Sequence, residues 1–331
     1  MYVLGIESSC DETAAAVIKD GRIICSNIIA SQIDTHKIYG GVVPEVASRM
    51  HLEIISHVVR EALNESNLKI DDIDLIGATR GPGLIGALLV GLSYGKALAF
   101  SNEIPFVGVN HMEGHISANY LDTDLEPPFI SLVVSGGHTY LIHVKNELEF
   151  EVVGRTKDDA AGEAFDKIAR TLGLGYPGGP YIDKYAKIGK SNIDFPRVML
   201  KEDNYDFSFS GLKTAVLNYI NSQKMKDEDI VIEDVARSFQ DAVLDVLVGK
   251  TMRLSQETGI TKIAVSGGVS ANDGLRKRFQ ELEEKGLIKS YFPSKILSTD
   301  NAAMIAGAAY FQYKREGTSP FSIKAIANLG L

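Results

Sequence analysis

The sequence predicts an α/β protein made of two units with the same topology, and two observations support this prediction. The first is that segments rich in Val and Ile, typical of strands, alternate with segments of helical periodicity along the 331-residue chain. The second is that glycine-containing turns occur in matching settings in the two halves. Repetition of one order of strands, turns and helices indicates an internal duplication.

The expected elements of the first half follow from their residue types. Segments rich in Val and Ile predict strands, and Asp20-Gly21 separates two of them. Pro44 can begin a helix, Glu45 suits its first turn, and apolar residues then recur at helical spacing. The expected strands are 3–8, 13–18, 23–30 and 75–79, and the expected helices are 44–67 and 85–100.

The second half repeats this order. Strands are expected at 129–134 and 139–144 on either side of the turn Ser135-Gly136-Gly137-His138. A further strand, 262–265, leads through Ser266-Gly267-Gly268 into a helix that starts near Asn272. Backbone N–H groups exposed in such turns suit a phosphate, so the paired turns favour a nucleotide cleft over plain connecting loops.

This pattern divides the chain into two expected lobes. Residues 1–103 form the N-terminal lobe, and residues 301–331 pack back on it. Residues 104–300 form the C-terminal lobe, with helical insertions. The segment Gly81-Pro82-Gly83-Leu84-Ile85-Gly86 fits G-x-G-x-x-G, but the strand that follows ends in Asn110 and not in an acid, so a dinucleotide site is rejected.

Composition excludes several classes of protein. With 45% hydrophobic and 23% charged residues, the chain is of ordinary globular composition. Its two cysteines cannot form a disulfide framework, which favours the cytoplasm, and we expect no signal peptide. The longest apolar run, 84–100, is broken by glycines and a lysine, so no membrane span is expected. The net charge of −9 argues against a protein that coats nucleic acid non-specifically.

The stretch Asn110-His111-Met112-Glu113-Gly114-His115 resembles a metallopeptidase motif at first sight. Peptidase motifs place the glutamate directly beside a histidine, whereas here the order is H-x-E-x-H. On a helix, His111 and His115 share a face and Glu113 points roughly 200° away, given about 100° per residue. The spacing supports a metal and argues against a peptidase, although a pair of histidines that only pack together stays open.

Carboxylates complete the candidate site. A metal held by two histidines needs a third ligand, for which Asp300 is the candidate; as an alternative, Asp300 caps the helix expected at 301–315. Asp11 and Glu12 lie in the first hairpin turn, where acids would face a bound phosphate or its metal, or transfer a proton. Local hydrogen bonding within the turn is the alternative role for both acids.

Motifs distributed over nearly the whole chain resemble the TsaD family of bacterial tRNA adenosine threonylcarbamoyltransferases, once labelled O-sialoglycoprotein endopeptidases. Several motifs in the right order are more specific than any one of them. They are LGIESSCDET (4–13), GGVVPEVASR (40–49), GPGLIGALLVG (81–91), VNHMEGH (109–115), VSGGHT (134–139), AGEAFDK (161–167), YPGGP (176–180), FSFSGLKT (207–214), VSGGVSAN (265–272) and TDNAAMIA (299–306).

The resemblance implies a fold, an activity and a set of site residues. The implied fold is the actin/Hsp70-like ATPase fold, with two lobes of duplicated topology around a nucleotide cleft. The implied reaction moves the threonylcarbamoyl group from threonylcarbamoyl-AMP to N6 of the adenosine beside the anticodon, in tRNAs reading codons that begin with A. The implied metal ligands are His111, His115 and Asp300, with Fe²⁺ expected and Zn²⁺ as the alternative. The implied residues for the adenylate-type ligand (threonylcarbamoyl-AMP, AMP or ATP) are Val134, Ser135, Gly136, Gly137, His138, Asp166, Gly179, Asp183 and Asn272.

The resemblance also implies partners. A smaller paralogue called TsaB and a P-loop ATPase called TsaE are expected to act with this chain, besides the tRNA itself. Asp11 or Glu12 is expected to accept the proton from the adenine amine. Two rival functions are a small-molecule kinase or ATPase of the same fold, which would not need the histidines, and a metallopeptidase.

Overall fold

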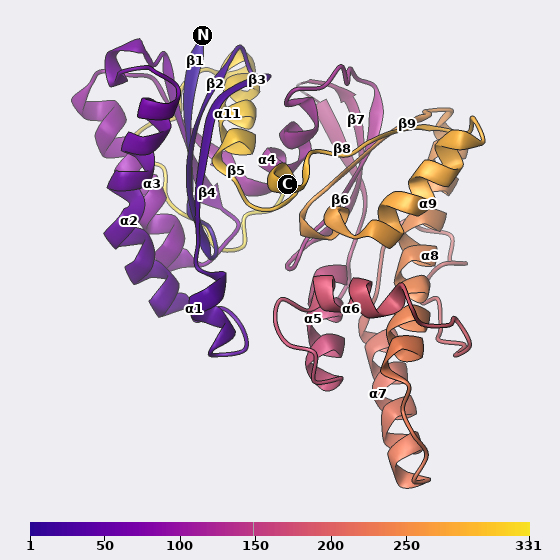
Figure 1. Ribbon diagram of the computed structural model, residues 1–331. Helices are drawn as coiled ribbons and strands as arrows, with labels where there is room; N and C mark the ends of the chain where they lie inside the picture. The colour runs from indigo at the N-terminus through magenta and orange to yellow at the C-terminus, as the bar shows by residue number, and fades with distance from the viewer. Residues whose placement is uncertain (148) are drawn as a thin grey trace. The chain divides into compact units, whose positions relative to one another are not determined.

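The computed structural model describes residues 1–147 and 149–331, and these form two compact units (Figure 1). One unit comprises Met1–Glu126 and Pro293–Leu331, and the other comprises Pro127–Phe292. The lobe boundaries expected after residues 103 and 300 differ from these. The first unit extends further because β5 (Phe106–Asn110) pairs with β4 (Leu75–Gly81).

The first unit contains a five-stranded sheet in the order β3-β2-β1-β4-β5. The first three strands along the chain are β1 (Tyr2–Glu7), β2 (Glu12–Lys19) and β3 (Ile23–Ser31), and each is antiparallel to the next. Strands β1, β4 and β5 run parallel to one another. The strands expected from Val and Ile content are therefore confirmed, with ends that differ by one or two residues.

Helices cover both faces of this sheet, because successive side chains of a strand point to opposite faces. Ala15 and Val17 of β2 contribute to a core with α2 (Pro44–Glu65) and α3 (Ile85–Ser101). Ala14 and Ala16 contribute to a second core with α11 (Ala302–Glu316). Helix α11 packs so closely on β1 that a Cβ on Gly5 would lie 2.2 Å from a backbone oxygen of the helix. Figure 1 shows α11 beside β1, although the two lie at opposite ends of the sequence.

The second unit repeats the topology of the first. Its sheet has the order β10-β9-β6-β7-β8, which read backwards is equivalent to that of the first sheet. Again three consecutive strands are antiparallel and the other two are parallel additions. The strands are β6 (Phe129–Val134), β7 (Thr139–Asn146), β8 (Glu149–Arg155), β9 (Lys262–Ser266) and β10 (Lys289–Tyr291). The predicted duplication is therefore confirmed.

The second unit carries more helix than the first. A single core joins one set of strand side chains, including Ile130 and Leu132, to its helices. Those helices are α5 (Ala161–Thr171), α6 (Gly178–Ala186), α7 (Ser210–Met225), α8 (Ile232–Thr258) and α9 (Asp273–Glu284). The remaining elements are short helices and 3₁₀ turns: α1 (Ile33–Lys37), α4 (His111–Ser117), α10 (Lys295–Ser298), and residues 70–72, 118–120 and 268–271. Among the described residues no helix is both long and apolar enough to cross a membrane.

Candidate functional site

The histidine motif forms the short helix α4, which begins where β5 ends. The side chain of Asn110 caps it by accepting a hydrogen bond of 2.9 Å from the N–H of Met112. Gly114 lets the helix pack directly on α11, since a Cβ there would lie 2.8 Å from Ile305 Cδ1. His111 and His115 are one helical turn apart and both are buried.

Asp300 comes from the other end of the first unit and lies directly before α11. The alternative role expected for it, as the cap of this helix, belongs instead to Asn301. The Asn301 side chain accepts a 3.0 Å hydrogen bond from the N–H of Met304. The carboxylate of Asp300 is therefore available to the histidines.

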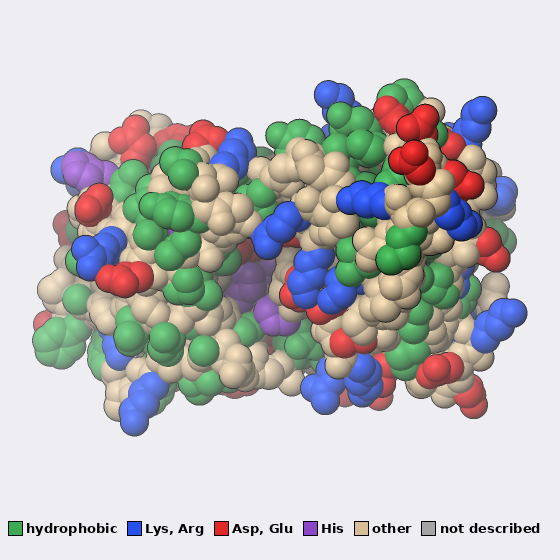
Figure 2. Space-filling view, turned by 90° about the horizontal axis from the view of Figure 1, so that it is seen from below, with side chains coloured by type: hydrophobic (Ala, Val, Ile, Leu, Met, Phe, Trp, Pro, Cys, Tyr) green, Lys and Arg blue, Asp and Glu red, His purple; other side chains and the backbone are tan. Residues whose placement is uncertain are grey.

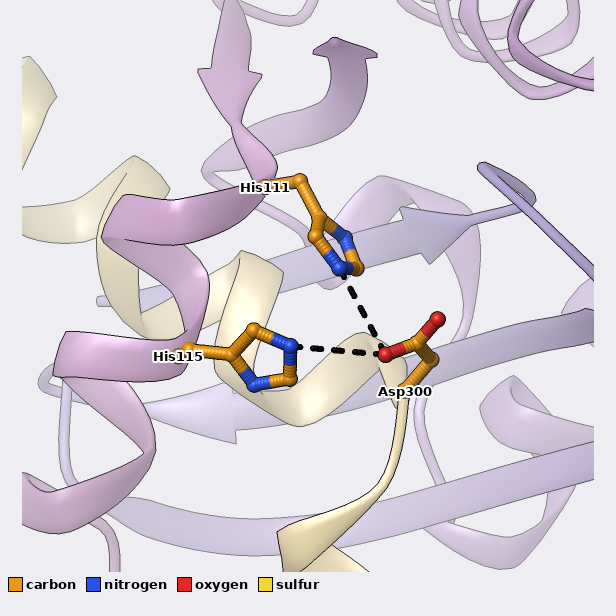
Figure 3. A group of neighbouring side chains, drawn as sticks. All are labelled: His111, His115 and Asp300. Atoms are coloured by element: carbon orange, nitrogen blue, oxygen red, sulfur yellow. Dashed lines mark ion pairs between the residues drawn. The ribbon is translucent and has the colours of Figure 1, made fainter. Parts of the chain in front are cut away.

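The three side chains converge on one point (Figure 3). One carboxylate oxygen of Asp300 lies 3.4 Å from Nε2 of His111 and 3.4 Å from Nε2 of His115. One ligand atom from each residue lies within 4.8 Å of the other two. Both ring nitrogens of the fully buried His115 lack a hydrogen-bond partner in the described part of the chain. Two imidazoles and a carboxylate with this spacing suit a divalent transition metal, so the residues fit one.

Glu7, at the end of β1, contacts the candidate site, although the sequence reasoning did not single it out. Its side chain is fully buried, and its Oε2 lies 3.0 Å from Nδ1 of His111 and accepts a 2.7 Å hydrogen bond from Thr79 Oγ1. Its other oxygen accepts from the N–H of Ser9. A carboxylate that accepts from one ring nitrogen leaves the opposite nitrogen facing the candidate metal position. The signal in the sequence was an acid at the end of an otherwise apolar strand.

Charges within this cluster are strongly coupled. Burial opposes ionisation of Asp300, but the neighbouring His111 outweighs it and lowers the pKa of Asp300 far below its ordinary value. Burial likewise opposes the charge on His111, but Asp300 and Glu7 raise the pKa of His111 well above its ordinary value. Burial lowers the pKa of His115. The site therefore combines two ionised carboxylates with one imidazole that stays neutral.

Glu113 lies apart from this group, as the helical spacing predicted. Its carboxylate is 3.9 Å from a guanidinium nitrogen of Arg315, and it is not among the residues that converge on the candidate metal position. In a peptidase of this type, the glutamate of the histidine motif itself lies beside the two ligands and acts as the general base. The arrangement of side chains therefore does not support the peptidase.

Asp11 and Glu12 follow β1 in the same unit and are largely buried. Glu12 Oε1 accepts a 3.3 Å hydrogen bond from Ser31 Oγ. Burial, together with the nearby charges of Asp11 and Asp300, raises the pKa of Glu12 to about 10. Folding therefore favours the neutral form of Glu12, which argues against Glu12 as the proton acceptor.

The expected ligand residues of the second unit form a connected series. The turn at Ser135 contacts the start of α5, where the N–H of Gly162 donates to its carbonyl at 3.2 Å. On α5, Asp166 accepts a 2.6 Å hydrogen bond from the N–H of Gly178 at the start of α6. Burial raises the pKa of Asp166 above its ordinary value. One helix thus links the glycine turn to the segment that contains Gly179.

The series continues from α6 to α9 through a residue that the sequence did not indicate. Gln240 of α8 donates to Asp183 Oδ1 at 3.1 Å and accepts from Asn272 Nδ2 at 2.8 Å. The Oδ1 of Asn272 in turn caps α9 by accepting from the N–H of Leu275 at 2.8 Å. A cavity of about 430 Å³ lies among α6, α8 and α9 and is lined in part by Asp183 and Gln240. A volume of this size is typical of small-molecule sites.

Several glycines of this series are not required by the packing of the chain itself. A Cβ on Gly136, Gly137, Gly179 or Gly268 would meet no atom of the chain within 4 Å, and none of these four has a positive φ. By contrast, Gly267 has φ of +84°, and a Cβ there would lie 2.5 Å from the carbonyl oxygen of Val134. Glycines beside open space allow a ligand to approach the backbone closely.

Comparison with known proteins identifies the family. A family model described as TsaD, tRNA N6-adenosine threonylcarbamoyltransferase, matches residues 23–307. Proteins named tRNA N6-adenosine threonylcarbamoyltransferase from Clostridium beijerinckii and Clostridioides difficile are 59% and 58% identical to the chain, each covering 99% of it and 98% of their own length. The chain belongs to the TsaD family.

The fold of this TsaD-family chain also resembles solved structures of other proteins. Component A of the (R)-2-hydroxyglutaryl-CoA dehydratase of Acidaminococcus fermentans matches with a TM-score of 0.57 at 17% identity, over 95% of this chain and 98% of that one. Together with the duplicated sheets, this similarity confirms the actin/Hsp70-like ATPase fold. At this level of identity the similarity concerns the fold alone.

Proposed function

We propose that this TsaD-family protein transfers the threonylcarbamoyl group from threonylcarbamoyl-AMP to N6 of the adenosine beside the anticodon, in tRNAs reading codons that begin with A. The observation that carries the proposal is the convergence of His111, His115 and Asp300 in a chain that matches the family over residues 23–307. A small-molecule kinase of this fold has no use for such a group.

His111, His115 and Asp300 hold one divalent metal, which we propose is Fe²⁺, with Zn²⁺ as the ion to be distinguished from it. Two histidines and a carboxylate with open positions are typical of non-haem Fe²⁺ sites, and three protein ligands also suit catalytic zinc. When bound, the metal supplies positive charge that stabilises the developing charge on the donor. Glu7 orients His111 for this role through their 3.0 Å contact.

The residues of the second unit bind the adenylate part of the donor. The exposed backbone of Gly136 and Gly137 suits the phosphate, because neither glycine is needed for the turn itself. Val134, Ser135 and His138 frame this turn, and Asp166 and Gly179 lie where α5 meets α6. Asp183 and Asn272 border the nucleoside and are held in place by Gln240. Fixing the donor in this way lowers the entropic part of the barrier.

The transfer forms a bond between N6 of the adenine and the carbamoyl carbon and breaks the bond from that carbon to the AMP phosphate. The donor is a mixed anhydride and is already activated, whereas the lone pair of the adenine amine is delocalised into the ring. The amine must therefore lose a proton as it reacts. We assign the role of acceptor to the carboxylate of Asp11, because the pKa of Glu12 is raised to about 10 by burial and by Asp11 and Asp300.

The partners of the reaction follow from the family. We propose tRNA as the acceptor, and a TsaB-type paralogue and a TsaE-type ATPase as protein partners in the cytoplasm. Figure 2 shows basic side chains interspersed with acidic ones on the face that it draws. A net charge of −9 disfavours non-specific binding of tRNA, so we propose that the chain binds tRNA through a limited contact or together with a partner.

The test is mass analysis of tRNA nucleosides after incubation of the protein with threonylcarbamoyl-AMP, unmodified tRNA and the two partner proteins. The expected product is N6-threonylcarbamoyladenosine, lost with His111→Ala and with Asp300→Ala. Glu113→Gln is the matched control and keeps full activity, because Glu113 lies outside the converging group. If no modified adenosine forms, the proposed function is wrong. If it forms equally well with His111→Ala, the metal has no role in transfer.

A further inference from the structure

The segment that follows α11, residues 317–331 and hereafter the tail segment, crosses the edge of the first sheet without forming a helix or strand. Near its start, the N–H of Ser319 donates to the carbonyl of Phe106 at 2.8 Å, and Ser319 Oγ accepts from the N–H of Gly108 at 3.1 Å. Phe321 stacks on Phe106 with ring centroids 6.0 Å apart. These contacts fix the tail segment along β5, the strand that leads into α4.

Further along, the tail segment reaches the glycine turn that follows β4. The N–H of Ile326 donates to the carbonyl of Arg80 at 2.8 Å, and the N–H of Gly83 donates to the carbonyl of Ala327 at 3.0 Å. Gly81 has no room for a side chain, because a Cβ there would lie 2.0 Å from the carbonyl oxygen of Ile326. The tail segment is therefore seated in a close, specific position beside the metal-bearing part of the unit.

The last of these contacts involves Asn110, whose amide nitrogen and amide oxygen both make hydrogen bonds. Its Nδ2 donates to the carbonyl of Gly330 at 2.9 Å, while its Oδ1 accepts from the N–H of Met112 and caps α4. Rotation of an asparagine side chain by 180° exchanges the positions of its amide oxygen and nitrogen. The hydrogen bond from Nδ2 to Gly330 selects the orientation in which Oδ1 faces the helix. The residue that follows the cap is His111.

We propose that the tail segment is a positioning element for the metal centre, acting through Asn110 on helix α4. Asn110 is a positioning residue in this scheme because its Nδ2 and Oδ1 are hydrogen-bonded to the backbone of Gly330 and of Met112. The inference rests on the proposed metal at His111, His115 and Asp300. Half of the residues from 326 to 331 are exposed, so the end of the tail segment contributes little to the core.

The experiment measures Co²⁺ affinity, by competition with a chelator, and the visible spectrum of bound Co²⁺, for four proteins. These are the unmodified chain, Asn110→Ser, a chain without residues 328–331, and the combination of the two. Serine still caps a helix but cannot donate to Gly330, so Asn110→Ser removes the link to the tail segment and keeps the cap. Ser319→Ala is the matched control, because it removes another contact of the tail segment and leaves Asn110 intact.

We expect each single change to weaken Co²⁺ binding about three- to tenfold and to shift the Co²⁺ absorption bands. This is less than the roughly 10- to 100-fold loss typical of a group that contacts a ligand directly, because Asn110 acts through the backbone of α4. The combined variant should bind no more weakly than either alone, because both changes break one link. Ser319→Ala should stay within about twofold of the unmodified chain.

Affinity within twofold after truncation, or effects of the two changes that multiply, would overturn the proposal. Thermal unfolding of each variant shows whether it is folded, and Asn110→Ser alone decides the matter if the truncated chain is not. Failure of the unmodified chain to bind Co²⁺ would instead overturn the metal centre itself, so the two failures are distinguishable.

Discussion

Replacing Glu7 by Gln should weaken metal binding while leaving the fold in place. The carboxylate of Glu7 is fully buried and lies 3.0 Å from Nδ1 of His111. Burial opposes its ionisation, but His111 lowers the pKa of Glu7, so the carboxylate is charged at neutral pH. Glutamine has the same shape without the charge, and its amide must present an N–H to one of three groups that donate now.

The size of the effect follows from what the carboxylate does. A charged acceptor on the far nitrogen makes imidazole a better ligand, and loss of such a partner lowers metal affinity about 10- to 100-fold. At about 1.4 kcal/mol for each factor of ten, this corresponds to roughly 1.4–3 kcal/mol of binding free energy. The donor that faces the amide N–H loses its acceptor, and this adds a cost in folding stability that is measured separately.

The assay is a titration of metal-free protein with Zn²⁺ and Co²⁺ against a chelator of known affinity, with urea unfolding of each variant. Thr79→Val is the control, because it removes a 2.7 Å hydrogen bond to the same oxygen of Glu7 but leaves the contact with His111. This control should bind metal within about threefold of the unmodified protein. Equal affinity for Glu7→Gln and the unmodified protein, with both folded, would show that the contact between Glu7 and His111 does not tune the site.

Further predictions concern the turns, the acids and the peptidase alternative. Gly137→Val should unfold at the same urea concentration as the unmodified protein, since a Cβ there meets no atom of the chain, but the side chain should block the phosphate and remove most of the affinity for AMP. Gly267→Ala should instead be clearly destabilised, because its Cβ would lie 2.5 Å from a carbonyl oxygen. Equilibrium dialysis and urea unfolding check this pair, and unchanged AMP binding by Gly137→Val would contradict the assignment. Burial and the charges of Asp11 and Asp300 raise the pKa of Glu12 from 4.5 to about 10, so between these pH values the folded state holds a proton that the unfolded state has lost. The free energy of unfolding therefore falls as pH rises through this range, by about 1.4 kcal/mol per pH unit. In metal-free protein, Glu12→Gln should therefore flatten the fall in stability between pH 6 and 9, and an unchanged slope would refute the shift. Glu113→Gln should bind Co²⁺ normally, as the same titration will show; a tenfold loss would bring Glu113 back into the site.

Much of the fold could be predicted because its signals are local. Pro44 begins α2 as expected, and the continuous apolar run from Ala14 to Ile18 in β2 marks a strand buried on both faces. The duplication could be predicted because each copy of the hairpin has its own turn residues. The boundary between units could not, since nothing local at Glu126 or Pro293 shows that α4 packs against α11.

The candidate site could be predicted only in part. His111 and His115 lie on one helix, so their spacing alone places them together. Asp300 is distant in sequence, so its position left two roles open, metal ligand or helix cap, and the family resemblance favoured the ligand. Glu7 was missed because its partner is distant in sequence and a single acid in a strand has no periodic signature. Gln240 was missed for the same reason, since it is an ordinary helical residue until Asp183 and Asn272 are brought to it.

The order of the ligands along the chain has a mechanical consequence. The second unit, Pro127–Phe292, is inserted in sequence between His115 and Asp300, and both of these ligands belong to the first unit. A metal held by them therefore acts as a cross-link that closes a loop containing the whole inserted unit. The longer the loop that a cross-link closes, the more conformational entropy the unfolded chain loses. Removal of the metal should then take away one link between the two ends of the insertion and leave the packing of α4 on α11 as the other. The force needed to separate those ends should therefore fall when the metal is removed.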